Sequence, residues 1–161
     1  MVTIALLTVY FMIIVTFFVT EKSQHPLVLI FGWLLVVMLH DAYFTLISLN
    51  LKLVTPSTVL SDFYVRLFAQ KFITPTIVVW AVDRINSDRS AVSKWSSFIF
   101  FSAILILQNV VLRYLGILSF GSGWEPWLSY TEGVLLIVIT WLGMLAYRRR
   151  LRKDGAWHGI H

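Results

Sequence analysis

The chain has 161 residues, of which 58% are hydrophobic and 13% charged, and its formal net charge is +5. Soluble domains carry roughly 25% charged residues, whereas the apolar residues here form blocks of about 20, the length that crosses a bilayer. The composition therefore excludes a soluble domain and predicts one integral membrane domain. The absence of cysteine excludes disulfides, thiolate metal sites and CxxC redox chemistry.

The apolar blocks predict an all-α bundle of five transmembrane helices. The third helix is the least certain, because charged and amide side chains interrupt its first half and Pro75 should kink it. Counted from Phe63 it is roughly 30 Å long, so it can cross. The alternative is four spans, with this segment partly interfacial and partly re-entrant. The membrane domain covers residues 1–147, with spans at 2–20, 27–50, 63–82, 95–118 and 130–147.

The orientation follows from the bias of lysine and arginine toward cytoplasmic loops. With five spans and a cytoplasmic C-terminus, Lys52 is alone outside, and the N-terminus is outside too. The inside segments then hold Lys22, Arg84, Arg89, Lys94 and the basic tail. A four-span arrangement satisfies the bias equally well but reverses the first two helices. Both arrangements place the tail and residues 83–94 in the cytoplasm of a cell-membrane protein.

Residues 148–161 form a basic tail directly after the last span. A basic residue beside an anionic leaflet contributes about 1 kcal/mol of attraction, so we expect the tail to contact anionic lipid at the inner leaflet. Nucleic-acid binding is not expected, because the positive charge is concentrated at a membrane exit. The lipid-contact residues are Arg148, Arg149, Arg150, Arg152 and Lys153.

Polar side chains within the spans are the candidate functional residues. An ionised group there costs about 2.5–3.5 kcal/mol, so it should face protein or water. In the five-span arrangement the second and fourth helices run in the same direction, and Asp41 and Arg113 differ in depth by roughly 6 Å. We expect a polar cluster around a water-accessible pocket in the outer half of the bundle. Its members are Asp41, Arg66, Asn109, Arg113 and Glu132.

Each of these residues also has a structural interpretation. Asp41 is either an ion or proton site or a paired structural carboxylate, and Asn109 and Arg113 lie on a helix face suited to interhelical hydrogen bonds. His40 is expected to be a buried neutral histidine. On the fifth helix, Gly133 and Thr140 predict a small-residue packing face. The aromatic residues Trp124, Trp127 and Tyr130 predict a belt at the membrane interface.

The stretch from Gln108 through RYLGILSFGSGWEPWLSY to Trp141 resembles a family of small, uncharacterised multi-spanning membrane proteins of endospore-forming bacteria. The shared features are Tyr-x-Gly near the end of a late helix, a Gly-Trp turn and a last helix that carries a tryptophan. Asp41 and Pro75 match earlier parts of the pattern, whereas Gln108 stands where a glutamate is expected. The resemblance implies a five-helix membrane protein and no known activity.

No nucleophile–base pair, phosphate-binding loop, dinucleotide fingerprint or zinc motif occurs in the sequence. We therefore expect no enzyme activity, no catalytic residue, no cofactor and no metal site. Two functions remain open. One is an accessory component that interacts with a partner membrane protein. The other is a small transporter or an ion or proton pathway that uses the intramembrane polar residues.

Overall fold

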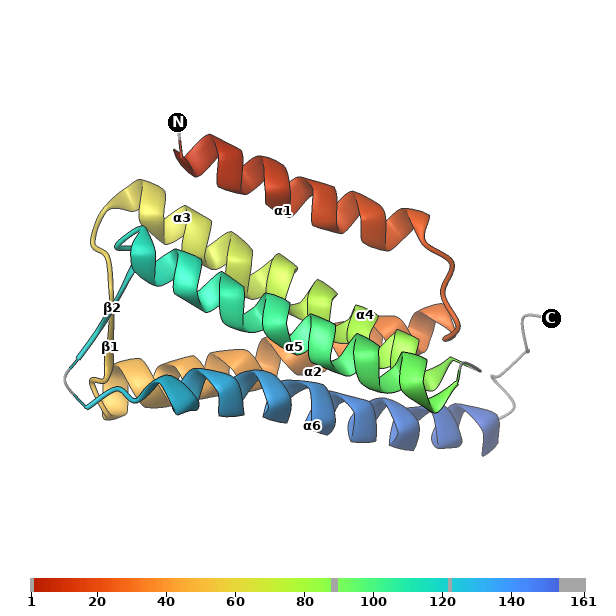
Figure 1. Ribbon diagram of the computed structural model, residues 1–161. Coiled ribbons are helices and arrows are strands. Elements are labelled where there is room, and N and C mark those ends of the chain that lie inside the picture. Colours follow the sequence, from red (N-terminus) through yellow and green to blue (C-terminus); the bar gives the residue numbers. More distant parts are fainter. Residues whose placement is uncertain (1, 88–89, 122, 154–161) are drawn as a thin grey trace.

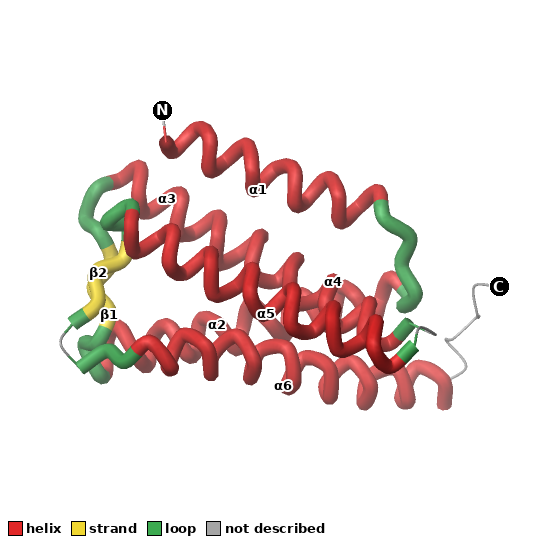
Figure 2. Tube along the Cα trace, in the orientation of Figure 1, coloured by secondary structure: helices red, strands yellow, loops and turns green. Residues whose placement is uncertain are grey.

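The computed structural model describes residues 2–87, 90–121 and 123–153. Helices dominate this part of the chain, and a short two-stranded ribbon joins two of the loops (Figures 1 and 2). In chain order the elements are α1 (Val2–Val19), α2 (Pro26–Thr45), η1 (Leu46–Asn50), β1 (Val54–Pro56), α3 (Leu60–Phe68), η2 (Ala69–Ile73), α4 (Thr74–Asn86), α5 (Ala91–Tyr114), β2 (Leu118–Phe120) and α6 (Pro126–Lys153).

The helices run alternately up and down between two ends of an elongated bundle (Figure 1). We name these the ribbon end, where β1 and β2 pair, and the basic end, where α1 leads into α2 and where α6 reaches Lys153. The helices α2 and α5 run in the same direction, as expected for the second and fourth helices of an up-and-down bundle. The α1 helix packs on η2 and α4 and stands apart from the rest of the bundle (Figures 1 and 2).

Four helical segments of the described chain are long and apolar enough to cross a membrane: Pro26–Asn50, Leu60–Asn86, Ala91–Tyr114 and Trp127–Lys153. The apolar stretch of α1, Ile4–Val19, is shorter. The all-α prediction is confirmed at this level. The second of these segments is the innermost, because 67% of its apolar window is buried against 22% for the first and third. Its polar residues can therefore face neighbouring helices.

A widened turn explains how this inner helix accommodates Pro75. The Thr74 N–H donates to the carbonyl of Ala69, five residues back, so that η2 is a π-turn between α3 and α4. In a regular α-helix the Pro75 ring would collide with the carbonyl of Lys71 and leave it without a donor. The wider turn makes room for the ring, and the expected interruption becomes a continuous helical segment from Leu60 to Asn86.

Glycine lets α2 and α6 approach closely. A Cβ atom on Gly32 would lie 2.5 Å from Sδ of Met144, and one on Gly143 would lie 2.6 Å from Cδ2 of Leu35. Each helix thus presents a glycine to a large side chain of the other. Small residues at such crossings bring helix backbones together. The expected small residues Gly133 and Thr140 are also buried on α6.

Helix ends and the ribbon differ most from the sequence prediction. The α5 helix ends at Tyr114 rather than 118, because Gly116 adopts φ +71° and closes the helix with bonds from Gly116 N–H to Arg113 and from Ile117 N–H to Leu112. The chain then pairs with the earlier loop, Val54 opposite Phe120. This ribbon was not predicted. The α6 helix also extends beyond 147, through the basic residues to Lys153.

Candidate functional site: a buried polar pocket near the ribbon end

The central contact of the site joins His40 of α2 to Glu132 of α6. Nδ1 of His40 lies 2.8 Å from Oε1 of Glu132, and the two side chains are 9% and 8% exposed. The distance is that of an ion pair, but Nδ1 lacks the angle of a hydrogen bond. The contact is an ion pair only when the imidazole is protonated, and the Glu132 carboxylate accepts no hydrogen bond within the described part of the chain.

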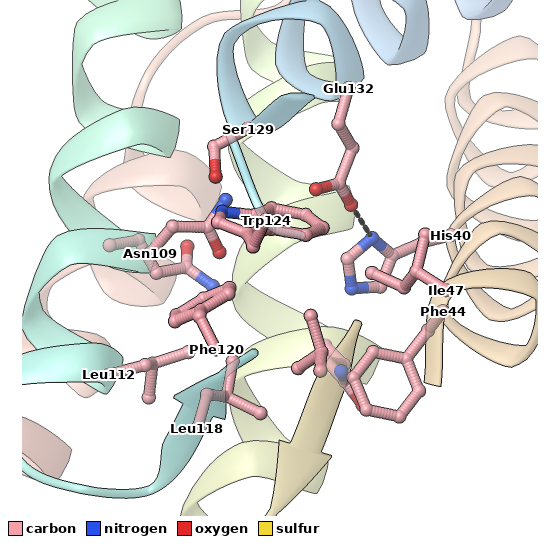
Figure 3. Close-up of a pocket in the computed structure, with 13 residues that line it drawn as sticks. His40, Phe44, Ile47, Asn109, Leu112, Leu118, Phe120, Trp124, Ser129 and Glu132 are labelled. Atoms are coloured by element: carbon pink, nitrogen blue, oxygen red, sulfur yellow. Dashed lines mark ion pairs between the residues drawn. The ribbon is translucent and has the colours of Figure 1, made fainter. Parts of the chain in front are cut away.

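A small cavity lies beside this contact, with a volume of about 30 Å³ (Figure 3). One water molecule occupies at least about 10–15 Å³ measured this way, so the cavity holds one or two waters. The second oxygen of Glu132 points toward the side where Asn109 and Ser129 lie (Figure 3). The polar lining is His40, Gln70, Gln108, Asn109, Ser129 and Glu132, and the aromatic walls are Phe44, Phe120 and Trp124.

Side chains from α2, η2, α5 and α6 meet at the pocket at similar depth. Glu132 lies six residues after the start of α6 and Gln108 six before the end of α5, so each is roughly 9 Å from its helix end. The amide of Gln108 donates to Oγ1 of Thr74 at 3.0 Å. Its Oε1 atom is enclosed without a partner among the described residues. An enclosed carbonyl oxygen without a donor is costly, so it marks a place for a ligand or a water.

The π-turn η2 separates two polar neighbours. Gln70 is 8% exposed and lines the pocket. Lys71 instead reaches out of the pocket, and its ammonium forms an ion pair with the carboxylate of Asp41 on α2. The side chains of this pair are 30% and 46% exposed, so it lies on the side of the bundle.

The structure brings together only part of the cluster expected from the sequence. Asn109 and Glu132 line the same pocket. The expected contact of Asp41 with Arg113 is wrong, because Asp41 pairs with Lys71 and the exposed Arg113 guanidinium lies 5.3 Å from the Phe120 ring centroid. Arg113 contributes instead to an adjoining cavity of about 60 Å³ that also contacts Asn109.

Arg66 is likewise outside the pocket, with its guanidinium 5.0 Å from the ring centroid of Phe44 and 5.4 Å from that of Phe63. His40 is buried, as expected, but its contact with Glu132 was not predicted. Sequence reasoning also missed Gln70 as a pocket residue and Thr74 as the hydrogen-bond partner of Gln108. Residue counting along the helix could have placed Gln70 at the depth of the pocket. Nothing in the sequence indicates the π-turn that orients its side chain.

A second polar site lies at the basic end. Asp83 is 2% exposed, and its Oδ1 atom accepts from the backbone N–H groups of Ser23 and Gln24, each at 3.0 Å. Nearby, the Lys22 ammonium donates to the Phe17 and Thr20 carbonyls at the end of α1. Burial lowers the pKa of Lys22, and the charge of Asp83 opposes this effect. These contacts fasten the α1–α2 loop to α4.

The tail residues Arg148 to Lys153 belong to α6, and Arg149, Arg150, Arg152 and Lys153 are exposed. Residues 154–161 lie outside the described part of the chain. In the described part, no three His, Asp or Glu side chains come close enough to hold a metal ion. A comparison with protein-family models found no match, and comparisons with curated proteins and with solved structures found none either.

Proposed function

We propose that this chain is a five-span protein of the cell membrane with its N-terminus outside. The ribbon argues against the four-span arrangement in which residues 63–82 do not cross, because that arrangement would put residues 51–62 and 119–129 on opposite sides of the membrane, whereas Val54 pairs with Phe120. The 18 residues of α1 are about 27 Å long, close to the roughly 30 Å hydrocarbon core. The proposed kinship with the endospore-former family rests on the sequence motifs alone.

We propose further that the protein is an accessory component that binds a partner membrane protein. The observation that carries this proposal is the Asp41–Lys71 ion pair on the side of the bundle. Charged groups within a membrane face the protein interior or a water-filled cavity, because lipid cannot solvate them. A pair that is 46% and 30% exposed is therefore best explained by a partner that covers it.

The position of α1 leaves room for such a partner. A groove of about 380 Å³ lies between α1 and α2 in the half of the bundle nearer the basic end. Its lining includes Phe17, Phe18, Ile30 and Trp33. Large apolar side chains in it would pack against another transmembrane helix. A partner helix that fills the groove and carries a hydrogen-bonding side chain at the depth of Asp41 would cover both features.

An ion or proton pathway is the second candidate, favoured by the buried His40–Glu132 contact. Chains of acidic and histidine residues carry protons in pumps and transporters. However, the core between this contact and the basic end is mainly aliphatic: Val36, Ile137 and Met144 are each at most 1% exposed, and the buried threonines Thr76 and Thr140 carry no titratable group. The pocket therefore ends inside the bundle, and the accessory function is the better supported of the two.

The test is purification of the tagged full-length protein in mild detergent, with quantitative mass spectrometry of what co-elutes. We expect one membrane protein at constant stoichiometry with the wild type. The uncharged double variant Asp41→Asn/Lys71→Met should lose it. The matched control Lys52→Gln, which removes a charge from the exposed ribbon-end loop, should keep it.

Retention of the same partner by the double variant would contradict the role of the ion pair. A second copy of the chain as the co-eluting species would assign the surface to self-association. Solute-dependent proton or ion flux in reconstituted vesicles, without a stable partner, would favour the pathway instead.

A further inference from the structure

We propose that the pocket beside His40 and Glu132 binds one small monovalent cation. This site is separate from the Asp41–Lys71 surface and does not depend on the partner proposed above. The ligands on offer are oxygen atoms: the Glu132 carboxylate, the side-chain carbonyls of Gln108 and Asn109, and the Ser129 hydroxyl. Such oxygen donors suit hard cations.

The charge of the pocket favours a single positive charge. Among the described residues that line the cavity, Glu132 is the one acidic side chain and His40 the one basic side chain. With a neutral imidazole the lining carries one net negative charge. The nearby arginines do not neutralise it, because Arg66 lies over Phe44 and Phe63, and Arg113 is exposed over Phe120. The remaining cation near this depth, Lys71, is paired with Asp41.

Unused hydrogen-bonding capacity points to a missing ligand. Glu132 is 8% exposed and accepts no hydrogen bond from the described residues, and Oε1 of Gln108 is enclosed without a donor. A buried carboxylate is costly unless it is paired or coordinates a cation. A cation between these two oxygens would satisfy both at once and would connect α5 with α6.

Size and ligand number decide which cation. The cavity of about 30 Å³ admits one ion with at most one or two waters and excludes organic ligands. A calcium site needs about 6–8 oxygen ligands and usually several carboxylates, whereas this cavity has a single carboxylate. We therefore expect sodium or potassium ions to bind rather than divalent ions.

The test is thermal unfolding of the detergent-purified full-length protein at neutral pH and constant ionic strength. Sodium or potassium chloride replaces choline chloride stepwise, and tryptophan fluorescence reports unfolding. A ligand that binds only the folded state raises its stability with concentration. We expect the melting temperature to rise by several degrees and to saturate with at least one of the two ions. Choline should leave it unchanged.

Three variants localise the effect. Glu132→Gln should abolish the cation-dependent shift, and Gln108→Leu should raise the half-saturating concentration at least tenfold. The double variant Asp41→Asn/Lys71→Met, which removes an ion pair outside the pocket without changing the net charge, should retain the full response. Equal behaviour in choline and in sodium or potassium, or an undiminished shift in Glu132→Gln, would overturn the proposal.

Radiolabelled sodium and radiolabelled potassium provide a second measurement if Glu132→Gln does not fold. One equivalent of at least one of the two ions should bind to the wild type and be displaced by the same unlabelled ion but not by choline. Absence of saturable binding of both ions, or an unchanged affinity in Gln108→Leu, would overturn the cation site and leave a water-filled pocket. Neither result would bear on the Asp41–Lys71 surface.

Discussion

Asp83 holds Ser23 by two kinds of hydrogen bond: its Oδ1 atom accepts from the backbone N–H at 3.0 Å and from the hydroxyl at 2.8 Å. Because Asp83 belongs to α4 and Ser23 to the loop after α1, the contact fixes where the first helix joins the bundle. The carboxylate also accepts from the backbone N–H of buried Gln24.

We predict that Asp83→Ala lowers the free energy of unfolding by roughly 1–3 kcal/mol, because it strands buried donors. Asp83→Asn should cost less, because its side chain keeps an acceptor oxygen. Unfolding of the purified protein by a denaturing detergent measures both variants. Glu21→Ala is the control, since it removes an exposed acidic residue from the same loop. An equal effect of Asp83→Ala and Glu21→Ala would contradict the proposed anchoring role.

The proposed topology predicts the labelling of single cysteines, which can be placed freely because the chain has none. With five spans, an impermeant thiol reagent added to intact cells should label Thr55→Cys and Ser119→Cys, which are exposed at the ribbon end. It should label Glu21→Cys and Ser90→Cys only after the membrane is permeabilised. External labelling of Glu21→Cys together with protection of Thr55→Cys would establish the four-span arrangement in which residues 63–82 do not cross.

The crossing of α2 and α6 predicts that Gly32→Ala destabilises the protein by about 1–3 kcal/mol, as overpacking of a tight core does. The new methyl group would lie 2.5 Å from Sδ of buried Met144. Gly133→Ala is a control on α6, because its methyl would face α5 instead of α2 and lie 3.6 Å from the nearest atom, Cβ of Leu105. Melting temperatures in one detergent compare the two, and similar losses would show that the close approach is not specific to Gly32.

The basic end of α6 predicts a salt-sensitive contact with anionic lipid. Replacing Arg149, Arg150, Arg152 and Lys153 with glutamine should weaken association of nanodisc-embedded protein with anionic lipid, since each charge contributes about 1 kcal/mol near the surface. Native mass spectrometry or lipid-exchange fluorescence at low and high salt measures it. Lys52→Gln, which removes a single charge at the ribbon end, should have a much smaller effect than the four substitutions in α6. Lipid binding that ignores both salt and these substitutions would refute an electrostatic contact.

The fold was largely predictable because a spanning helix is recognised from the hydropathy of a whole segment, which a few polar residues within it do not change. The pocket was only partly predictable. Asn109 and Glu132 share it because depth along a helix follows from residue counting, whereas Asp41 and Arg113 do not meet because the direction of a side chain around its helix also matters. The partner of Asp41, Lys71, lies in a π-turn that no sequence period reports.

The ribbon illustrates another limit. Pairing of Val54 with Phe120 joins loops 66 positions apart in the chain, and its backbone bonds leave little trace in side-chain patterns. Gly116, by contrast, carried a local signal for an earlier end of α5 than the predicted residue 118, because a positive φ is a local requirement that glycine meets without strain.

The π-turn η2 has one more consequence. An extra residue in a helix turns everything beyond it by about 100°, so α3 and α4 present their sequence patterns with different phases. The buried face of α4 therefore cannot be found by continuing the helical period of α3 across the turn. Deleting one residue from Ala69–Ile73 would restore a uniform phase, turning Arg66 and its neighbours relative to Thr74 and the buried face of α4. The widened turn thus joins two short amphipathic segments with different phases into a single inner helix.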